Sequence, residues 1–291
     1  MKYQFIDTYR SAFAVLKMCR ALKISKSGYY AWRVRPQSKR ALENEKLDHH
    51  IKTIYRKNRG TYGSPRITKA LNKQNIACSE NRVAKRMSIN SITAKTKKRF
   101  KVTTNSKHNH PVAENLLGQN FKAQRPNQVW ASDITYIWTQ EGWLYLAVIV
   151  DLFSRQIVGW AMSNRLLGQE IVLNAFKQAI WRRRPQSGVI FHSDQGVQYA
   201  CQAFRDLLQH YKFIQSVSGK GNCYDNAVVE SFFHTLKIEL IYFENYITRE
   251  DAKNSIFEYI EIYYNRDRIH STLNYCSPGQ FEQIWIDTKA A

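Results

Sequence analysis

Residues 127–162, NQVWASDITYIWTQEGWLYLAVIVDLFSRQIVGWAM, decide the fold of this chain. They are rich in β-branched and aromatic residues, and short polar breaks divide them into three parts. This pattern is typical of strands joined by tight turns. We expect strands at 127–138, 143–153 and 156–162, and because the breaks are short, neighbouring strands are expected to run antiparallel.

The segments that follow alternate between helix and strand. They are a helix at 168–184, a short buried strand at 188–192, a helix near 201–211, a strand at 214–217 and a helix within 222–240. Three antiparallel strands followed by α-β-α-β-α predict a mixed five-stranded sheet with flanking helices. This α/β order is that of the ribonuclease H-like fold.

The first 94 residues have helical periodicity instead. We predict helices at 14–23, 29–35, 42–58, 64–74 and 80–90. Ser64 is expected to cap its helix, with Pro65 at the first helical position, and Ser79 to cap the next. The first two and the last two of these helices have helix-turn-helix spacing, although helical hairpins with basic surfaces also occur in proteins that bind no DNA.

These patterns divide the chain into five predicted parts. They are a helix-turn-helix segment at 1–40, a second helix-turn-helix-like DNA-binding domain at 41–94, a basic linker at 95–125, a ribonuclease H-like core at 126–245 and a C-terminal helical extension of that core at 246–291. Residues 95–110 contain six Lys or Arg and no acid, so we expect this part of the linker to order on a phosphate backbone.

The positive charge of the chain is confined to its N-terminal part. Residues 1–125 hold 29 Lys/Arg and 6 Asp/Glu, a balance of +23, whereas residues 126–291 hold 15 and 17, a balance of −2. A generally basic surface would explain a high isoelectric point but not this division. The division favours a region that binds a polyanion, nucleic acid above all, attached to a nearly neutral domain.

Composition also excludes several classes of protein. No apolar run approaches the roughly 18 residues of a membrane span, and the N-terminus lacks the apolar core of a signal peptide, so we expect a soluble, intracellular protein with no membrane partner. The five cysteines contain no Cys-x-x-Cys pair and are odd in number, which argues against both a disulfide framework and a zinc site. His108 and His110 lack further ligands at a suitable spacing.

Three acidic residues stand where packing does not require them. Asp133 and Asp194 lie at the ends of predicted strands, and Glu230 borders the apolar face of the last core helix. A carboxylate among strand residues is costly to bury unless it is paired or binds a cation. Each alone is more often an ordinary structural or solvated residue, but together, with 60 and 35 residues between them, they have the order of the metal-binding triad of polynucleotidyl transferases.

At this point the sequence resembles a known family, the integrase-like transposases of the two-reading-frame bacterial insertion sequences (the IS-three family), and more distantly retroviral integrases. The resemblance is carried by residues 25–32 (SKSGYYAW), 59–67 (RGTYGSPRI), 126–136 (PNQVWASDITY), 151–155 (DLFSR), 192–196 (HSDQG), 222–233 (NCYDNAVVESFF) and 264–270 (YNRDRIH). The spacing of 35 residues between Asp194 and Glu230, with a lysine seven positions later, is its most specific element.

The resemblance implies an Mg²⁺-dependent transposase of the bacterial cytoplasm, associated with the nucleoid. It would bind the terminal inverted repeats of its element, cut one strand to free a 3′-OH and transfer that strand to target DNA. Asp133, Asp194 and Glu230 would hold two Mg²⁺ ions, which Mn²⁺ can replace. Double-stranded DNA and at least one further copy of the chain are the implied partners, and the active form in the family is often a frameshift fusion with an upstream reading frame.

Contacts with DNA are predicted for basic residues in the helical part, the linker and the core. They are Arg66, Arg82, Lys85, Arg86, Lys97, Lys98, Arg99 and Lys237. Lys237 lies two turns after Glu230, where a cation can contact a substrate phosphate. Four other residues are set aside: Asp151 for a turn or hydrogen-bonding role, Asp225 and Asn226 as helix caps, and His192 as a strand-end residue.

Two other functions remain open on the sequence. The first is a nuclease with the same fold that only hydrolyses, resembling ribonuclease H or a junction resolvase. It would not need a sequence-specific N-terminal region. The second is a DNA-binding regulator with an inactive core, which the complete acidic triad disfavours.

Overall fold

The computed structural model of the chain describes residues 1–95, 114–118, 122–165, 169–219 and 226–290. Its five described strands form one mixed sheet in the order β3-β2-β1-β4-β5. They are β1 (Val129–Thr139), β2 (Gly142–Asp151), β3 (Ile157–Ser163), β4 (Ile190–Ser193) and β5 (Ile214–Val217). β1, β2 and β3 pair antiparallel, whereas β4 pairs parallel with both β1 and β5. The expected ribonuclease H-like α/β fold is confirmed.

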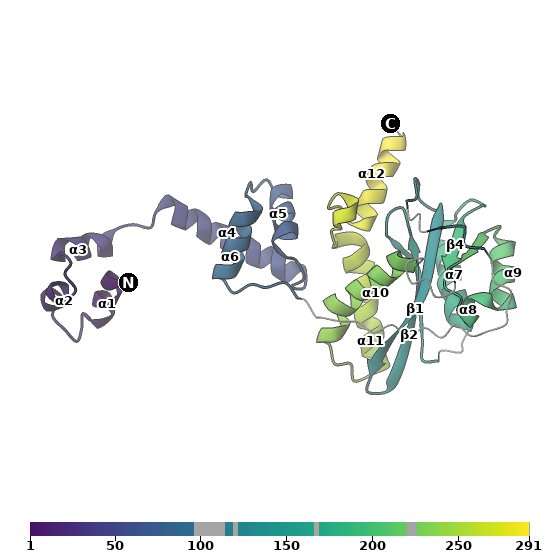
Figure 1. Cartoon of the computed structure of the whole chain (residues 1–291), viewed down its shortest axis with the longest axis horizontal. Helices are drawn as coiled ribbons and strands as arrows, with labels where there is room; N and C mark the ends of the chain where they lie inside the picture. Colours follow the sequence, from purple (N-terminus) through teal and green to yellow (C-terminus); the bar gives the residue numbers. More distant parts are fainter. Residues whose placement is uncertain (96–113, 119–121, 166–168, 220–225, 291) are drawn as a thin grey trace.

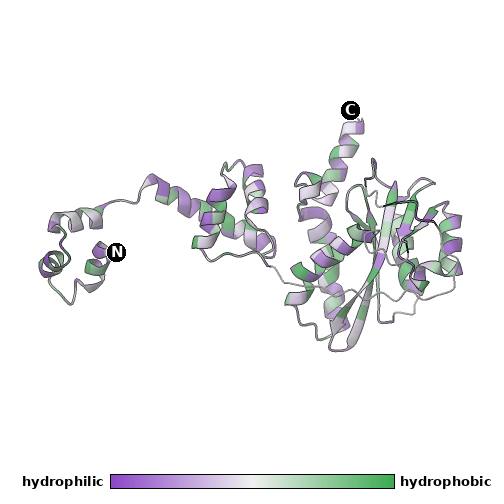
Figure 2. Ribbon diagram, viewed as in Figure 1, coloured by the Kyte–Doolittle hydropathy of each residue, from purple (hydrophilic) through white to green (hydrophobic). Residues whose placement is uncertain are grey.

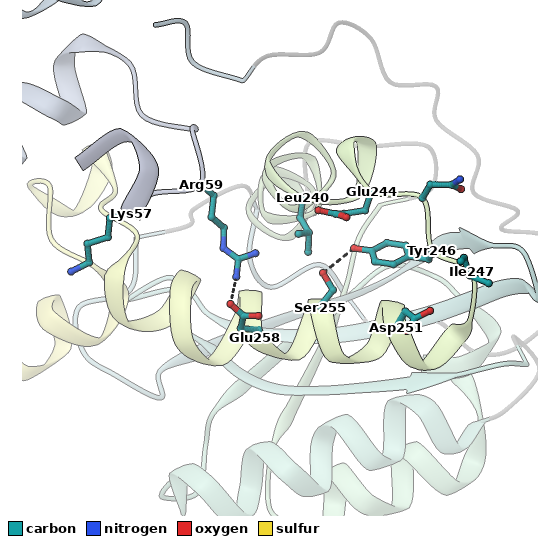
Figure 3. Close-up of a pocket in the computed structure, with 10 residues that line it drawn as sticks. Lys57, Arg59, Leu240, Glu244, Tyr246, Ile247, Asp251, Ser255 and Glu258 are labelled. Carbon is teal, nitrogen blue, oxygen red and sulfur yellow. Dashed lines mark hydrogen bonds and ion pairs between the residues drawn. The ribbon is translucent and has the colours of Figure 1, made fainter. Parts of the chain in front are cut away.

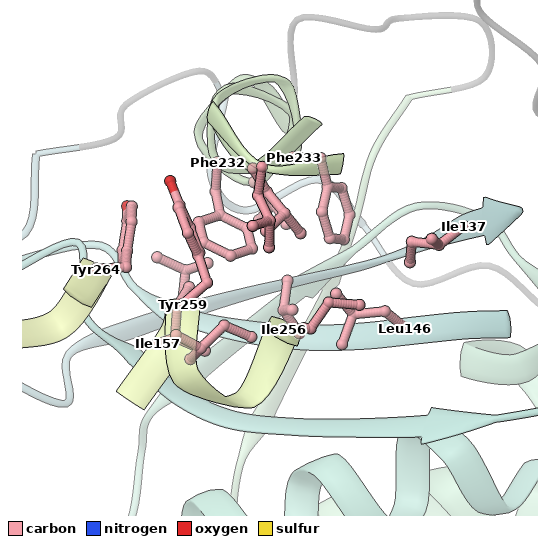
Figure 4. Close-up of a cluster of buried hydrophobic side chains, with 14 of the residues drawn as sticks. Ile137, Leu146, Ile157, Phe232, Phe233, Ile256, Tyr259 and Tyr264 are labelled. Carbon is pink, nitrogen blue, oxygen red and sulfur yellow. The ribbon is translucent and has the colours of Figure 1, made fainter. Parts of the chain in front are cut away.

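Helices cover both faces of the sheet (Figure 1). One face packs against α7 (Gln169–Arg183), the short α8 (Val197–Ala200) and α9 (Gln202–His210), and the other against α10 (Ala227–Glu239) and α11 (Arg249–Phe257). Successive side chains of a strand point to opposite faces. Accordingly, Trp130 is buried on the α7 side, whereas Ala131 and Ile137 are buried on the α10 side with the aromatic cluster of Figure 4.

The chain begins with a small helical cluster. Its helices are α1 (Lys2–Tyr9), α2 (Val15–Ala21) and α3 (Lys26–Val34), and they bury Ile6, Met18, Cys19 and Tyr29. The sequence pattern did not predict α1, because Ile6 is its single buried residue among otherwise polar or exposed positions. The contact that fixes it comes from elsewhere in the chain, since the Tyr29 hydroxyl donates to Asp7 Oδ1 at 2.9 Å.

A second helical cluster consists of α4 (Lys39–Lys57), α5 (Ser64–Lys73) and α6 (Glu80–Ile89). Polar and apolar residues alternate along these helices, as expected when each has one buried side (Figure 2). Ser79 caps α6 as predicted, accepting from the backbone N of Arg82 at 3.3 Å. The expected cap at Ser64 is wrong: Gly63 occupies the cap position, and Ser64 is already the first helical residue, ahead of Pro65.

The C-terminal part packs on both the core and the second helical cluster. A short 3-10 helix, η2 (Ile241–Phe243), follows α10, and after α11 come the π-helix η3 (Glu258–Asp267), the 3-10 helix η4 (Ser271–Leu273) and α12 (Pro278–Ala290). Ile269 is buried within the α4–α6 cluster, and its backbone N donates to the Tyr62 hydroxyl at 2.9 Å. Arg59 also pairs with Glu258 at 2.6 Å (Figure 3).

The structure also describes four of the five cysteines and the lengths of the helices. The four cysteines in the described ranges, Cys19, Cys78, Cys201 and Cys276, are all free. None of the helices in those ranges has the length and apolar character needed to cross a bilayer.

Candidate active site

The sheet places the two aspartates side by side. β1 and β4 are neighbouring parallel strands in which Ser132 is level with Ser193, so Asp133 and Asp194 are each the next residue along. Asp194 leaves the end of β4, whereas β1 continues beyond Asp133. The two carboxylates, with 60 residues between them in the sequence, therefore come from adjacent positions at one level of the sheet.

The electrostatics of Asp133 reflect this convergence. Burial, followed by the negative charge of Asp194 and with a contribution from Glu230, raises the pKa of the Asp133 carboxyl well above its ordinary value. A hydrogen bond at 2.7 Å from the backbone N of Ile134 to Asp133 Oδ1 acts in the opposite direction. The charges of both other predicted carboxylates thus act on Asp133.

Asp194 is held by the turn that follows β4. The backbone N of Gly196 donates to Asp194 Oδ1 at 3.0 Å. A methyl group at position 196 would lie 2.9 Å from that oxygen, so glycine leaves room for the carboxylate to turn back on its own loop. The side chain of Asp194 is consequently fixed in orientation by local backbone geometry.

Tyr199, on α8, links β1, the strand that carries Asp133, to a helix on the α7 side of the sheet. Its fully buried hydroxyl lies 2.9 Å from Ser132 Oγ, which in turn donates to the carbonyl of Val148 at 2.8 Å. Burial, together with the charges of Asp133 and Asp194, raises the pKa of the Tyr199 phenol well above its usual range. Sequence analysis did not single out Tyr199, because its role depends on contacts across three elements.

Glu230 reaches the site from the first turn of α10. The Glu230 residue as a whole is exposed. Neighbouring atoms nevertheless shield its carboxylate partly from water, which raises the pKa of Glu230. The start of α10 is attached to β1 by Asn226, whose Nδ2 donates to the Ser132 carbonyl at 3.1 Å. Asn226 occupies the cap position of α10 as predicted, but its side chain makes no capping hydrogen bond to the helix and bonds to β1 instead. Asp225 lies outside the described residues.

Lys237 is the basic residue of the site. It is only 8% exposed, and its Nζ lies 5.3 Å from the centre of the Tyr136 ring on β1. Burial lowers the pKa of Lys237, and the negative charge of Asp133 opposes that shift. The positive charge of Lys237 in turn lowers the pKa of Asp133. The predicted edge position of Lys237 on α10 is thus an interior position between helix and sheet.

The donor set has the chemistry of a site for a hard divalent cation. Three carboxylates supply only oxygen ligands, and Mg²⁺ takes few protein oxygens, completing its shell with water and phosphate. The negative charges of Asp194 and Glu230 raise the pKa of Asp133, and a cation placed beside these carboxylates would relieve that repulsion. Within the described ranges, however, no three His, Cys, Asp or Glu side chains are close enough to form a metal-binding group as they stand.

The residues set aside from catalysis have structural roles. Asp151 is fully buried and accepts from the backbone N of Asn127 at 2.7 Å and of Phe153 at 2.9 Å. Its burial raises its pKa to about 6, against the opposing effect of those amides and of Arg183. His192 is also buried, with Nδ1 2.9 Å from Ser216 Oγ and Nε2 3.2 Å from Ser218 Oγ, so both ring nitrogens are engaged with β5 and its end.

The predicted DNA-contacting residues have different surroundings. On α6, Arg86 makes a bidentate pair with Asp48 and Arg82 contacts Glu43 and Asn44, so both arginines turn toward α4, whereas Lys85 is exposed. Arg66 lies 3.6 Å from Glu239 of the core. Lys97, Lys98 and Arg99, together with His108 and His110, lie outside the described residues.

A large hollow near the core is distinct from the carboxylate site. This cavity of about 660 Å³ between α4, η2 and α11 is lined by ten residues, nine of them labelled in Figure 3, and none is Asp133, Asp194 or Glu230. Its walls are instead held by contacts such as the Tyr246 hydroxyl to Ser255 Oγ at 3.1 Å. The three predicted catalytic carboxylates therefore lie outside this hollow.

Comparison with protein families gives three matches along the chain. An integrase core domain model matches residues 123–223, a second integrase core domain model matches residues 230–284, and an HTH-like domain model matches residues 41–100. The two core models together include all three carboxylates.

Curated relatives match nearly the whole chain. The transposase InsF for insertion sequence IS3A of Escherichia coli (strain K12) is 42% identical over 284 residues, which cover 97% of this chain and 98% of the relative. The insertion element IS600 uncharacterized 31 kDa protein of Shigella sonnei is 42% identical over 266 residues, covering 91% and 97%.

Solved structures with similar folds are more distant in sequence. A chain of the simian T-cell lymphotropic virus intasome, in complex with a PP2A regulatory subunit, gives a TM-score of 0.47 at 16% identity and covers 74% of this chain and 70% of its own. The HTLV-2 integrase catalytic core domain in complex with magnesium gives 0.43 at 18% identity, covering 55% and 99%.

Proposed function

The chain belongs to the family of insertion-sequence IS3 transposases, and from this premise we propose that it carries out DNA transposition by phosphoryl transfer. It cuts one DNA strand at an end of its element to free a 3′-OH and joins that hydroxyl to a second phosphodiester. The observation that carries the proposal is the parallel register of β1 and β4, in which Asp133 and Asp194 follow directly paired residues, together with the effect of the Glu230 charge on Asp133.

The three carboxylates have the ligand chemistry for Mg²⁺, and we propose that they hold two such ions, with Mn²⁺ as a substitute. When bound, the ions supply activation of the attacking oxygen and stabilisation of charge on the leaving oxygen. Because the Glu230 side chain is exposed, rotation about its own side-chain bonds is the movement that completes the set.

The neighbouring residues of the chain position these ligands. The amides of Ile134 and Gly196 orient Asp133 and Asp194, and Asn226 holds the start of α10 against β1. Lys237 favours the ionised form of Asp133 and places a positive charge beside the site, where a DNA phosphate would meet it.

Binding to double-stranded DNA is assigned to the basic N-terminal part. The HTH-like region supports recognition of the terminal repeats, with Lys85 as the exposed basic residue of α6. Joining two ends requires that both be held together, so we propose an assembly of at least two copies of the chain.

Charge-removing substitutions of equal size test the assignment. Asp133→Asn, Asp194→Asn and Glu230→Gln are each expected to reduce cutting and joining by at least about 10³-fold, a typical scale for essential groups, while DNA binding is kept. The assay follows labelled DNA carrying the two ends of the encoding element, with Mg²⁺. Asp206→Asn, an exposed acid on α9, is the matched control and should behave as the unmodified protein.

The products distinguish transposition from hydrolysis. Joined strands support the proposal, whereas cut strands without any joining would indicate the nuclease alternative. Joining at the unmodified rate by any triad variant would refute the assignment of that residue.

A further inference from the structure

A second cavity, distinct from the carboxylate site, opens on the other side of α10. It has a volume of about 340 Å³, at the lower end of the roughly 300–1,000 Å³ typical of ligand sites. Its walls come from α5, the turn between β2 and β3, the first turns of α10, and residues 264–272. The polar residues that line it include Arg66, Arg155, Ser231, Thr235, Arg268 and His270.

The cavity is strongly cationic. Three arginines line it and no acidic side chain does. Arg268 is neutralised from behind by Glu239, which accepts from its Nε at 2.8 Å and from its Nη2 at 2.7 Å, and Arg66 lies 3.6 Å from the same carboxylate. A single glutamate thus serves two of the three guanidinium groups, which leaves the cavity with a positive charge of about two.

Arg155 is the least compensated of the three. Its side chain is half-buried, and burial lowers its pKa, yet among the described residues it makes no ion pair. Burying a charge without a partner is costly. A half-buried arginine that lines a cavity without an ion pair is suited to bind an anion that enters the cavity.

The positive charges of the three arginines also act on His270. Its Nε2 lies 3.1 Å from Arg268 Nη1, and burial together with the charges of Arg268, Arg66 and Arg155 lowers its pKa to about 2. The imidazole is therefore neutral and can accept a hydrogen bond from the guanidinium. This arrangement leaves the arginine charges available to an anion.

The position of the cavity points to the source of that anion. Ser231 and Thr235 line it from α10, and Ser231 directly follows Glu230 in the chain. Four stretches that carry the family resemblance meet here: 59–67 through Arg66, 151–155 through Arg155, 222–233 through Ser231, and 264–270 through Arg268 and His270. Only one of them, 222–233, also contains one of the three carboxylates, Glu230.

We propose that this cavity binds a backbone phosphate of the DNA strand that is cut at the carboxylates. Arg155 supplies the main contact, Arg66 and Arg268 supplement its charge, and the hydroxyls of Ser231 and Thr235 complete the donors. The inference rests on the proposed function. It adds a positioning site beside the catalytic one and makes Arg66, which comes from α5, a contact shared between the HTH-like region and the core.

Salt dependence of DNA binding measures this interaction. On duplex DNA, each phosphate that a protein no longer neutralises lowers the slope of log affinity against log salt by about 0.9. Arg155→Gln is therefore expected to bind a labelled element-end duplex about tenfold more weakly at low salt, with a slope smaller by about 0.9. Arg155→Lys should retain most of the slope. The matched control is Arg205→Gln, a half-buried arginine on α9 on the opposite face of the sheet, which should leave the slope unchanged.

Neutral methylphosphonate groups, placed singly at phosphates near the cut site, identify the phosphate directly. One such position should weaken binding by the unmodified protein and have no further effect on Arg155→Gln. An unchanged slope in Arg155→Gln, or equal sensitivity of both proteins to every neutral position, would overturn the proposal. Stabilisation of the unmodified protein by inorganic phosphate, with no sensitive DNA position, would assign the cavity to a free anion and overturn it equally.

Two further measures keep the test decisive. If Arg155→Gln melts well below the unmodified protein, Thr235→Glu takes its place, because it adds a carboxylate at the cavity wall and should lower the slope in the same way. All binding is measured without divalent ions. An unchanged salt dependence would therefore not affect the assignment of the three carboxylates. If strand transfer is not observed, the binding measurement can still be interpreted.

Discussion

At the scale of single residues, the groups that surround a carboxylate determine whether it has a structural role or can bind a ligand. Asp133 and Asp151 both belong to core strands and both have raised pKa values because of burial. Asp151 uses its oxygens to accept from two backbone amides and Arg183. Asp133 accepts from one amide, and the charges of Asp194 and Glu230 act on it, so its other carboxylate oxygen is better suited to bind a cation than to stabilise the fold.

A pH prediction belongs to His270. Its folded pKa of about 2 lies below the unfolded value near 6.5, so between these values the unfolded chain binds the extra proton. Stability is therefore lost as pH falls below about 6.5. His270→Gln should remove this loss and reduce the slope of unfolding free energy against pH, between about pH 6 and 4, by up to about 1.4 kcal/mol per unit.

Urea unfolding at a series of pH values measures this slope. His234→Gln, on the exposed side of α10, is the control and should keep the slope of the unmodified protein. Identical slopes for His270→Gln and the unmodified protein would mean that His270 titrates normally in the folded state.

At the scale of elements, close approach of β3 to α7 requires a residue without a side chain. A Cβ at Gly159 would lie 2.2 Å from the Ala175 carbonyl oxygen and 2.8 Å from Ala179 Cβ. Because the shortest of these contacts is with the backbone of Ala175, it can be relieved only if α7 moves away from β3. Gly159 thus sets the depth at which α7 packs on the sheet.

Gly159→Ala is expected to lower the free energy of unfolding by about 1–3 kcal/mol through this overpacking. Chemical denaturation measures the change. The control is Gly63→Ala at the cap position of α5, where the nearest heavy atom to the added methyl is 3.7 Å away, so only the smaller loss of a glycine cap, about 0.5–1 kcal/mol, is expected. Equal stabilities of the two variants would contradict the packing argument.

At the scale of the whole molecule, the C-terminal part joins the HTH-like region to the core. Ile269 enters the α4–α6 cluster beside Ile67 and Leu71, and Thr61 Oγ1 lies 2.9 Å from the Tyr263 hydroxyl. Arg66 extends this contact to Glu239 at the end of α10. The HTH-like region and the helix that carries Glu230 are consequently in direct contact.

Ile269→Ala tests that connection. Removing a buried isoleucine side chain costs about 2–5 kcal/mol, and here the loss falls on the contact between α4–α6 and the C-terminal part. Hydrogen exchange measured by mass spectrometry should show faster exchange in α4–α6, with β1 and β2 unchanged. Ile286→Ala, at a position 45% exposed on α12, should leave exchange unaltered. Faster exchange confined to the core strands would refute the proposed docking.

The sequence by itself determined the elements and the acids. Strand alternation and helix periodicity located β1 to β5 and most helices within a few residues, because these patterns are local consequences of burial on one side. The order of the elements, the charge division and the spacing of Asp133, Asp194 and Glu230 also follow from the chain alone. The assignment of the three acids as catalytic ligands is still a prediction.

Only the tertiary structure decided which residues meet. α1 depends on a bond from Tyr29, Asn226 bonds to β1 rather than to its own helix, and Arg82 and Arg86 turn toward α4. Arg66, Arg155 and Arg268 come from three separate stretches and share one cavity. No local pattern contains such contacts, because the energy of a long-range pair depends on the distance that packing sets between residues far apart in the chain.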